Sequence, residues 1–158
     1  MLFLLFQVGE NRYALETSRV VEVVPLVELK PLPQAPEGVA GVFDYRGRPI
    51  PAVDLASLML GRPARELLST RIVVVNYPDD FGSNHFLGLV AERVTSTLRK
   101  DARDFVDPGG HPGLSPQLGP ILMEDGTAIQ WVHERRWLPQ RVSELLTSDL
   151  SPAGHEPR

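Results

Sequence analysis

The chain has 158 residues, of which 42% are hydrophobic and 23% charged, and its 16 basic and 20 acidic side chains give a net charge of −4. This composition is ordinary for a soluble globular protein of one domain or of two small subdomains. Nucleic-acid binding relies on a basic surface, so the acidic balance argues against a polynucleotide partner. The absence of cysteine excludes disulfides and thiolate chemistry and is compatible with a reducing cytoplasm.

The first six residues, Met1–Phe6, are all apolar. A membrane span needs about 20 such residues, and a signal peptide places a positive region before a longer apolar core. We therefore expect this run to be the first strand, followed by a turn.

The first half of the chain predicts several short strands. Apolar and β-branched runs bounded by Gly, Pro, Asn or Asp are typical of strands. Such runs occur at Leu2–Val8, Arg12–Leu15, Val20–Pro25, Val42–Tyr45 and Pro49–Val53. Four prolines between residues 25 and 36 indicate a loop or a sheet edge, because proline cannot donate to a strand ladder.

A helix is predicted over Leu55–Leu60. Asp54 can cap its first turn, Gly61 can end it, and Pro63 lies just beyond. A helix of this kind covers the mouth of a barrel and needs no other role.

The second half continues with strands and ends in a predicted helix. Two strands, Arg71–Tyr77 and His85–Val94, flank a polar loop, and residues 101–120 predict an irregular crossing segment. A second hairpin, Ile121–Glu124 and Thr127–Val132, surrounds the turn dipeptide Asp125-Gly126. A C-terminal helix is expected from Pro139 onward, with Val142, Leu145 and Leu146 on one face. Residues 148–158 are expected to form a flexible tail.

These elements predict a mainly β architecture with two helices. We expect two small barrels, about residues 12–64 and 65–125, each with a compact valine-rich core. The N-terminal strand and the C-terminal segment would complete them within a single domain over residues 1–147.

Motifs for catalysis are incomplete. In Gly113-Leu114-Ser115-Pro116-Gln117, glutamine replaces the second glycine of a nucleophile elbow, and Pro116 has no N–H for an oxyanion hole. His133 is followed four positions later by Trp137 and not by a second zinc ligand. We therefore predict no catalytic, cofactor-binding or metal-binding residue. An enzyme whose site is assembled from distant residues remains an alternative.

The hairpin within Gly41–Leu55 carries the strongest recognition signal. Gly47 can take the positive φ of a type II turn or of a turn-plus-bulge loop. Arg46 beside it is a solvated turn residue, a partner for a carboxylate on another protein, or a brace of its own barrel through an internal ion pair. Glu22 is either the solvent-facing residue of an edge strand or the polar rim of an apolar groove.

In order and spacing, these segments resemble the CheW-like domain family across residues 2–147. The resemblance rests on Val20–Pro25, the proline-rich connection, Gly41–Leu55, Ile72–Val75, Leu87–Val90 and Leu118–Pro120. It implies two SH3-like five-stranded β-barrels packed together. The sequence Arg-Val-Val-Glu-Val-Val-Pro at residues 19–25, together with the Gln130-Trp131 strand, further suggests the Wsp-type surface-sensing branch.

The resemblance also implies a function. It predicts a non-catalytic adaptor that couples the cytoplasmic tip of methyl-accepting chemoreceptors to the regulatory domain of a CheA-type histidine kinase. Such an adaptor is cytoplasmic and is recruited to receptor arrays at the inner membrane. The partner-binding positions it implies are Val20, Glu22, Gly41, Arg46 and Ile72. The alternative is a free-standing β-barrel module with an unrelated partner, such as a proline-rich or extended peptide.

Overall fold

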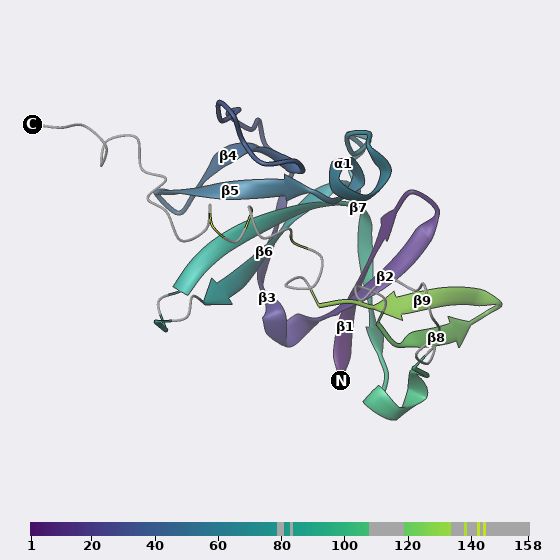
Figure 1. Ribbon diagram of the computed structural model, residues 1–158. Coiled ribbons are helices and arrows are strands. Elements are labelled where there is room, and N and C mark those ends of the chain that lie inside the picture. The colour runs from purple at the N-terminus through teal and green to yellow at the C-terminus, as the bar shows by residue number, and fades with distance from the viewer. Residues whose placement is uncertain are drawn as a thin grey trace, which may run out of the picture.

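The computed structural model describes residues 1–78, 81–82, 84–107, 119–133, 138, 142 and 144. Over these residues the chain is mainly β, with one short α-helix and two 3-10 turns (Figure 1). The strands are β1 (Leu2–Val8), β2 (Asn11–Glu16), β3 (Val20–Pro25), β4 (Val39–Tyr45), β5 (Arg48–Asp54), β6 (Arg71–Pro78), β7 (Asn84–Arg99), β8 (Ile121–Glu124) and β9 (Thr127–Trp131). The helix α1 spans Leu55–Leu60, and the 3-10 turns η1 and η2 span Thr17–Arg19 and Ala102–Asp104.

Strand pairing forms two groups that share β7. The first group has the order β3-β6-β7-β5-β4, and the second has the order β7-β1-β2-β9-β8. The pairs β5–β7 and β2–β9 are parallel, and the others are antiparallel. The expected division into residues 12–64 and 65–125 differs from this grouping, because β3 and β5 pair with β6 and β7 across residue 64.

The long strand β7 passes from one group to the other near Glu92. Its pairing with β6 runs through Ala91, and its pairing with β1 starts at Glu92. The register against β1 shifts at this point, and Arg93 has a positive φ of 50°. A local irregularity of this kind bends a strand. The strand predicted to stop at Val94 therefore continues to Arg99, where it pairs with the start of β1.

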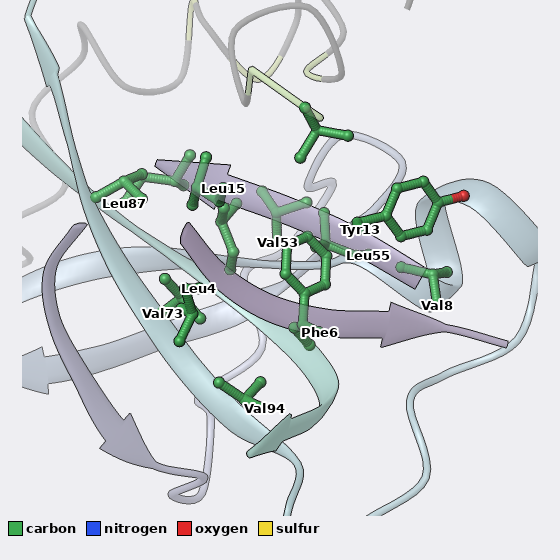
Figure 2. Packing of buried hydrophobic residues seen from close by; sticks show 14 of the residues in the cluster. Leu4, Phe6, Val8, Tyr13, Leu15, Val53, Leu55, Val73, Leu87 and Val94 are labelled. Atoms are coloured by element: carbon green, nitrogen blue, oxygen red, sulfur yellow. The ribbon is translucent and has the colours of Figure 1, made fainter. Parts of the chain in front are cut away.

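The largest buried cluster draws side chains from both groups. Figure 2 shows Leu4, Phe6 and Leu15 of β1 and β2 lying close to Val53 and Val73 of β5 and β6. Each large aliphatic or aromatic side chain buried in this way contributes roughly 1.5–3 kcal/mol. The two groups are therefore packed together through a common core.

Each group also has a smaller cluster of its own. Phe43, Ile50 and Ile72 belong to the cluster of the first group. In the second group Trp131 packs on Phe3, with ring centroids 5.0 Å apart. Trp137, the other tryptophan, lies outside the described residues.

The helix predicted over Leu55–Leu60 is confirmed with its caps. The Asp54 carboxylate accepts the backbone N–H groups of Ala56 at 3.0 Å and Ser57 at 3.2 Å, and Gly61 ends the helix with φ of 74°. The predicted C-terminal helix and the tail at residues 148–158 lie outside the described residues, except for Val142 and Glu144. Val142 and Leu138, which precedes the predicted helix, are buried in the common core.

Candidate partner-binding site

The tip of the β4–β5 hairpin is a two-residue turn. Tyr45 pairs with Arg48, so Arg46 and Gly47 form the whole connection. Both have positive φ, 52° and 81°. This is the backbone pattern of a type I′ turn, whose twist matches that of the flanking strands. The expected type II turn or bulged loop is therefore wrong, because Arg46 as well as Gly47 is left-handed.

The Glu22 carboxylate contacts this tip from strand β3. Its Oε1 atom accepts a hydrogen bond from the Tyr45 hydroxyl at 2.7 Å and another from the Arg46 guanidinium at 2.8 Å. The guanidinium also lies over the Tyr45 ring, 5.2 Å from its centroid. Even so, 72% of the Arg46 side chain and 40% of the Glu22 side chain are exposed. Arg46 is therefore held in place and still faces solvent.

The contacts shift the pKa values of two of these groups. The pKa of Glu22 is lowered, mainly by the hydrogen bond from Tyr45 and further by the positive charge of Arg46. The pKa of Tyr45 is raised, first by burial and then by its donation to Glu22. At neutral pH the cluster thus contains a carboxylate, a neutral phenol and a guanidinium.

The same cluster joins the two edges of the first group. Strand β3 lies at one end of its strand order and β4 at the other. Glu22 connects them at the hairpin tip, and farther along Lys30 and Val42 exchange two backbone hydrogen bonds of 2.8 Å. Arg46 thus braces the first strand group through its ion pair with Glu22, which is one of the three alternatives that the sequence left open. Its side chain also remains accessible to a partner.

Gly41 lies inside this junction and is buried. A Cβ atom at this position would lie 2.5 Å from the carbonyl oxygen of Lys30, and φ here is 154°. Close approach of two backbones therefore requires glycine at this position. Its role is to let the Lys30 segment pair with Val42, and we find it buried within the first group.

The remaining two expected positions differ in exposure. Val20 is half-buried at the start of β3, where it pairs with Val75 and packs against the common core. Ile72 has 0% exposure and belongs to the core of the first group, so direct partner contact by its side chain is excluded in this structure. Of the five positions, only Glu22 and Arg46 contact one another, with Val20 on the same strand as Glu22.

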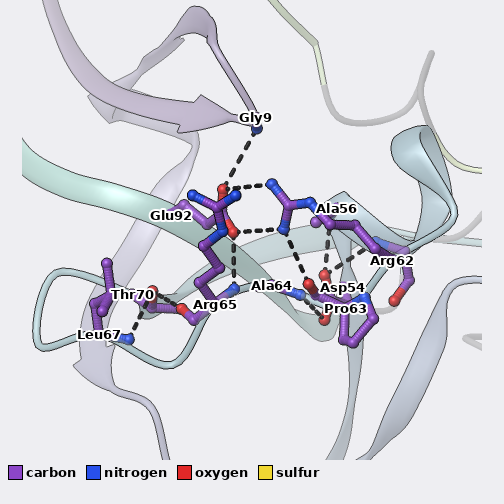
Figure 3. A network of polar contacts seen from close by, with 11 residues as sticks. Gly9, Asp54, Ala56, Arg62, Pro63, Ala64, Arg65, Leu67, Thr70 and Glu92 are labelled. Carbon is purple, nitrogen blue, oxygen red and sulfur yellow. Dashed lines mark hydrogen bonds and ion pairs between the residues drawn. The ribbon is translucent and has the colours of Figure 1, made fainter.

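A second polar cluster, centred on Glu92, was not foreseen from the sequence. The Glu92 side chain is 9% exposed, and its carboxylate accepts hydrogen bonds from the Arg62 guanidinium at 2.9 and 3.4 Å (Figure 3). It also accepts the backbone N–H groups of Arg65 at 2.7 Å and Gly9 at 3.4 Å. The available signal was an acidic residue that directly follows the apolar run Leu87–Ala91. Glu92 thus connects the β1–β2 turn to the loop after α1.

The pKa of Glu92 is lowered by these partners. The hydrogen bond from Arg62 is the largest cause, and the backbone donors Arg65 and Gly9 add to it, while burial acts in the opposite direction. Nearby, Asp54 accepts the N–H of Ala64 at 2.9 Å in addition to capping α1. The loop after α1 is therefore fixed by two buried carboxylates.

Within the part of the chain that the structure describes, His, Cys, Asp and Glu side chains form no group of three that could hold a metal ion. No helix among the same residues is long and apolar enough to cross a membrane.

Comparisons with known proteins agree with the fold and with the sequence signature. The CheW-like domain family matches residues 2–140. Protein FrzA of Myxococcus xanthus is 30% identical over 121 residues, which cover 75% of this chain and 72% of FrzA. The chemotaxis protein CheW of Helicobacter pylori is 27% identical over 106 residues, 67% of this chain and 61% of that protein.

A solved structure has the same fold. The crystal structure of the scaffolding protein TtCheW from Thermoanaerobacter tengcongensis matches with a TM-score of 0.70 at 24% identity, covering 84% of this chain and 83% of that chain. The mainly β chain therefore shares the fold of TtCheW. Together with the family match over residues 2–140, this establishes that the chain belongs to the CheW-like domain family.

Proposed function

We propose that this chain is a non-catalytic adaptor that couples methyl-accepting chemoreceptors to a CheA-type histidine kinase in a bacterial chemosensory array. Membership of the CheW-like family supports the adaptor role. Relatives named chemotaxis protein CheW support the chemosensory setting. The adaptor would act in the cytoplasm and be recruited to receptor arrays at the inner membrane.

The observation that carries the proposal is the exposed ion pair at the β4–β5 tip. Arg46 is fixed by Glu22 and by the Tyr45 ring, yet 72% of its side chain faces solvent. A guanidinium held in this way loses little freedom on binding and offers a planar fork to a partner carboxylate. Val21, the sequence neighbour of Glu22 on β3, is also exposed. We assign partner contact to Arg46, Glu22 and the adjoining part of β3 from Val20.

Two separate surfaces are needed for coupling. In this proposal the two five-stranded groups are SH3-like barrels. One surface takes a helix of the receptor tip in an apolar groove, and the other pairs barrel to barrel with the regulatory domain of the kinase. Each contact is expected to be moderate, because linkage in an array raises the effective concentration of the second partner.

The experiment is a binding assay with two partners from one candidate system, the regulatory domain of the kinase and a cytoplasmic receptor fragment. Native protein is compared with Arg46→Ala and Glu22→Ala. Arg103→Ala is the matched control, because Arg103 is also exposed and also ion-paired, with Asp101 at 3.5 Å. We expect both test variants to remain folded and to lose affinity for at least one partner, while the control binds as the native protein does.

Two results would count against the proposal at different levels. Undiminished binding of both partners by Arg46→Ala and Glu22→Ala means that the assigned surface is wrong. Failure of the native protein to bind either partner means that the adaptor role itself is wrong, and it would favour a free-standing module with an unrelated partner.

A further inference from the structure

A cavity of about 750 Å³ opens beside Glu92, where the two strand groups meet. Its walls are the turn between β1 and β2, the end of α1, and the loop that follows α1. The turn and the helix touch on one side, since a Cβ atom at Gly9 would lie 3.0 Å from Cδ1 of Leu60. The volume falls within the range of about 300–1,000 Å³ that is typical of ligand sites.

Exposed leucines border the cavity. Leu60 and Leu67 line it and are 45% and 54% exposed. Their sequence neighbours Met59 and Leu68 are exposed as well, Leu68 almost completely. Exposed apolar surface gathered at a hollow is typical of an interaction site. Leu60 and Leu67 are about half exposed at the hollow, and an apolar side chain of a peptide segment can cover them.

The charges around the cavity favour an acidic partner. Arg62, Arg65 and Arg93 line it together with Glu10 and Glu92. Arg62 is neutralised by Glu92 at 2.9 Å, whereas the Arg65 and Arg93 side chains are exposed. The remaining balance is positive, and arginine binds carboxylates through a planar pair of donors.

Hydrogen bonds hold the walls of the cavity in position. Glu92 fixes the backbone of Arg65, and Asp54 fixes that of Ala64. The Thr70 hydroxyl donates to the Arg65 carbonyl and accepts the N–H of Leu67 at 3.3 Å. A preformed loop reduces the conformational entropy that is lost on binding.

We propose that this cavity and the leucines beside it form a docking site for an acidic, leucine-containing peptide segment of a partner protein. The segment would place an apolar side chain against Leu60 and Leu67 and acidic side chains on both Arg65 and Arg93. Neither Glu22 nor Arg46 lines the cavity, and the proposal does not depend on the partners proposed above.

The test uses the full chain and a fluorescent amphipathic peptide of about four helical turns, with leucines on one face and glutamates on the other. One control peptide replaces every leucine by serine, and a second replaces every glutamate by glutamine. The protein variants are Arg93→Glu and Leu67→Ser. Their matched controls are Arg99→Glu, exposed on the same strand, and Met123→Ser, exposed on β8. Thermal melting verifies that each variant is folded.

We expect saturable binding with a Kd below about 1 mM, weakened about tenfold by either test variant and changed less than about twofold by either control variant. Both control peptides should bind at least about tenfold more weakly. The proposal is overturned if the native protein shows no saturable binding, if the serine peptide binds equally well, or if Arg93→Glu and Arg99→Glu have equal effects.

Further measurements separate other occupants. Inorganic phosphate that displaces the peptide at low millimolar concentration would indicate a simple anion site. Sedimentation with anionic phospholipid vesicles that depends on Arg93 and Leu67 would indicate a membrane surface instead. Self-association that is lost in Leu67→Ser would indicate a second copy of this chain. Each of these results would overturn the assignment to a peptide segment.

Discussion

The Oε1 atom of Glu22 lies 2.8 Å from the guanidinium of Arg46 and also accepts the Tyr45 hydroxyl. One carboxylate oxygen therefore joins strand β3 to the tip of the β4–β5 hairpin, at opposite ends of the first strand group. The pair that we propose as a partner contact is also part of the internal structure. Mutational tests must therefore separate loss of binding from loss of bracing.

Tyr45→Phe makes that separation. It removes the hydrogen bond to Glu22 but keeps the aromatic ring beneath Arg46. Loss of one hydrogen bond is expected to lower the free energy of unfolding by about 0.5–1.5 kcal/mol. Urea denaturation measures this change in stability. Titration with each partner measures affinity, which should fall less in Tyr45→Phe than in Arg46→Ala. Equal loss of binding in the two variants would show that Arg46 acts by bracing and makes no direct contact.

Glu92→Gln tests the buried carboxylate through its pH dependence. Because the pKa of Glu92 is lower in the folded chain than its ordinary value of 4.5, its contribution to stability is complete above that pH and is lost as pH falls through the folded pKa. We expect the variant to be about 1–3 kcal/mol less stable than native protein at neutral pH. The difference should shrink below about pH 4.5.

The measurement is urea denaturation of both proteins across an acidic pH series. Glu37→Gln, which removes an exposed carboxylate, controls for the general effect of one charge. A difference between native protein and Glu92→Gln that stays constant from neutral to acidic pH would contradict the assigned role of the ionised carboxylate.

Gly41→Ala and Gly47→Ala form a matched pair in one hairpin. The added methyl group at Gly41 would meet the Lys30 carbonyl oxygen at 2.5 Å, whereas at Gly47 it meets no atom within 4 Å. We expect Gly47→Ala to lose about 1–2 kcal/mol from its left-handed backbone alone. Gly41→Ala should lose more, on the order of 3 kcal/mol, because it also opens the Lys30–Val42 junction. Equal denaturation midpoints for the two variants would contradict the close packing at Gly41.

Asp54→Ala tests the organisation of α1 and the loop after it. The variant leaves the N–H groups of Ala56, Ser57 and Ala64 without their acceptor. A cost of about 1–3 kcal/mol is expected, with faster amide hydrogen exchange at those three residues. The exposed Asp44 offers the control Asp44→Ala. Unchanged exchange at Ala64 would show that Asp54 serves the helix alone.

The helix caps and turns that depend on neighbouring residues could be predicted from the sequence. The cap at Asp54 and the end of α1 at Gly61 each depend on residues close together in the chain. The turn at Arg46-Gly47 is placed correctly by the sequence but its type is not, because Arg46 also takes a positive φ. The alternatives for Arg46 stayed open because the identity of its carboxylate partner depends on how distant strands are arranged. The structure shows Glu22 as that partner, 24 positions away.

Contacts between distant segments were harder to foresee. Glu92 receives donors from Arg62, Arg65 and Gly9, which lie 30, 27 and 83 positions away. Ile72 was assigned to a surface although its β-branched run signals burial on both faces. Its place in the core follows because β6 lies between β3 and β7. The alternation of residues along a strand predicts which side chains share a face. It does not predict which other strands lie beside that strand.

The adaptor proposal is tested most directly by asking whether the chain holds both partners at once. Sedimentation velocity of the native protein with the kinase regulatory domain and the receptor fragment gives that answer. We predict a single species that contains all three proteins, and its loss with Arg46→Ala. Mutually exclusive binding, in which the receptor fragment displaces the kinase domain, would contradict a coupling role for this chain.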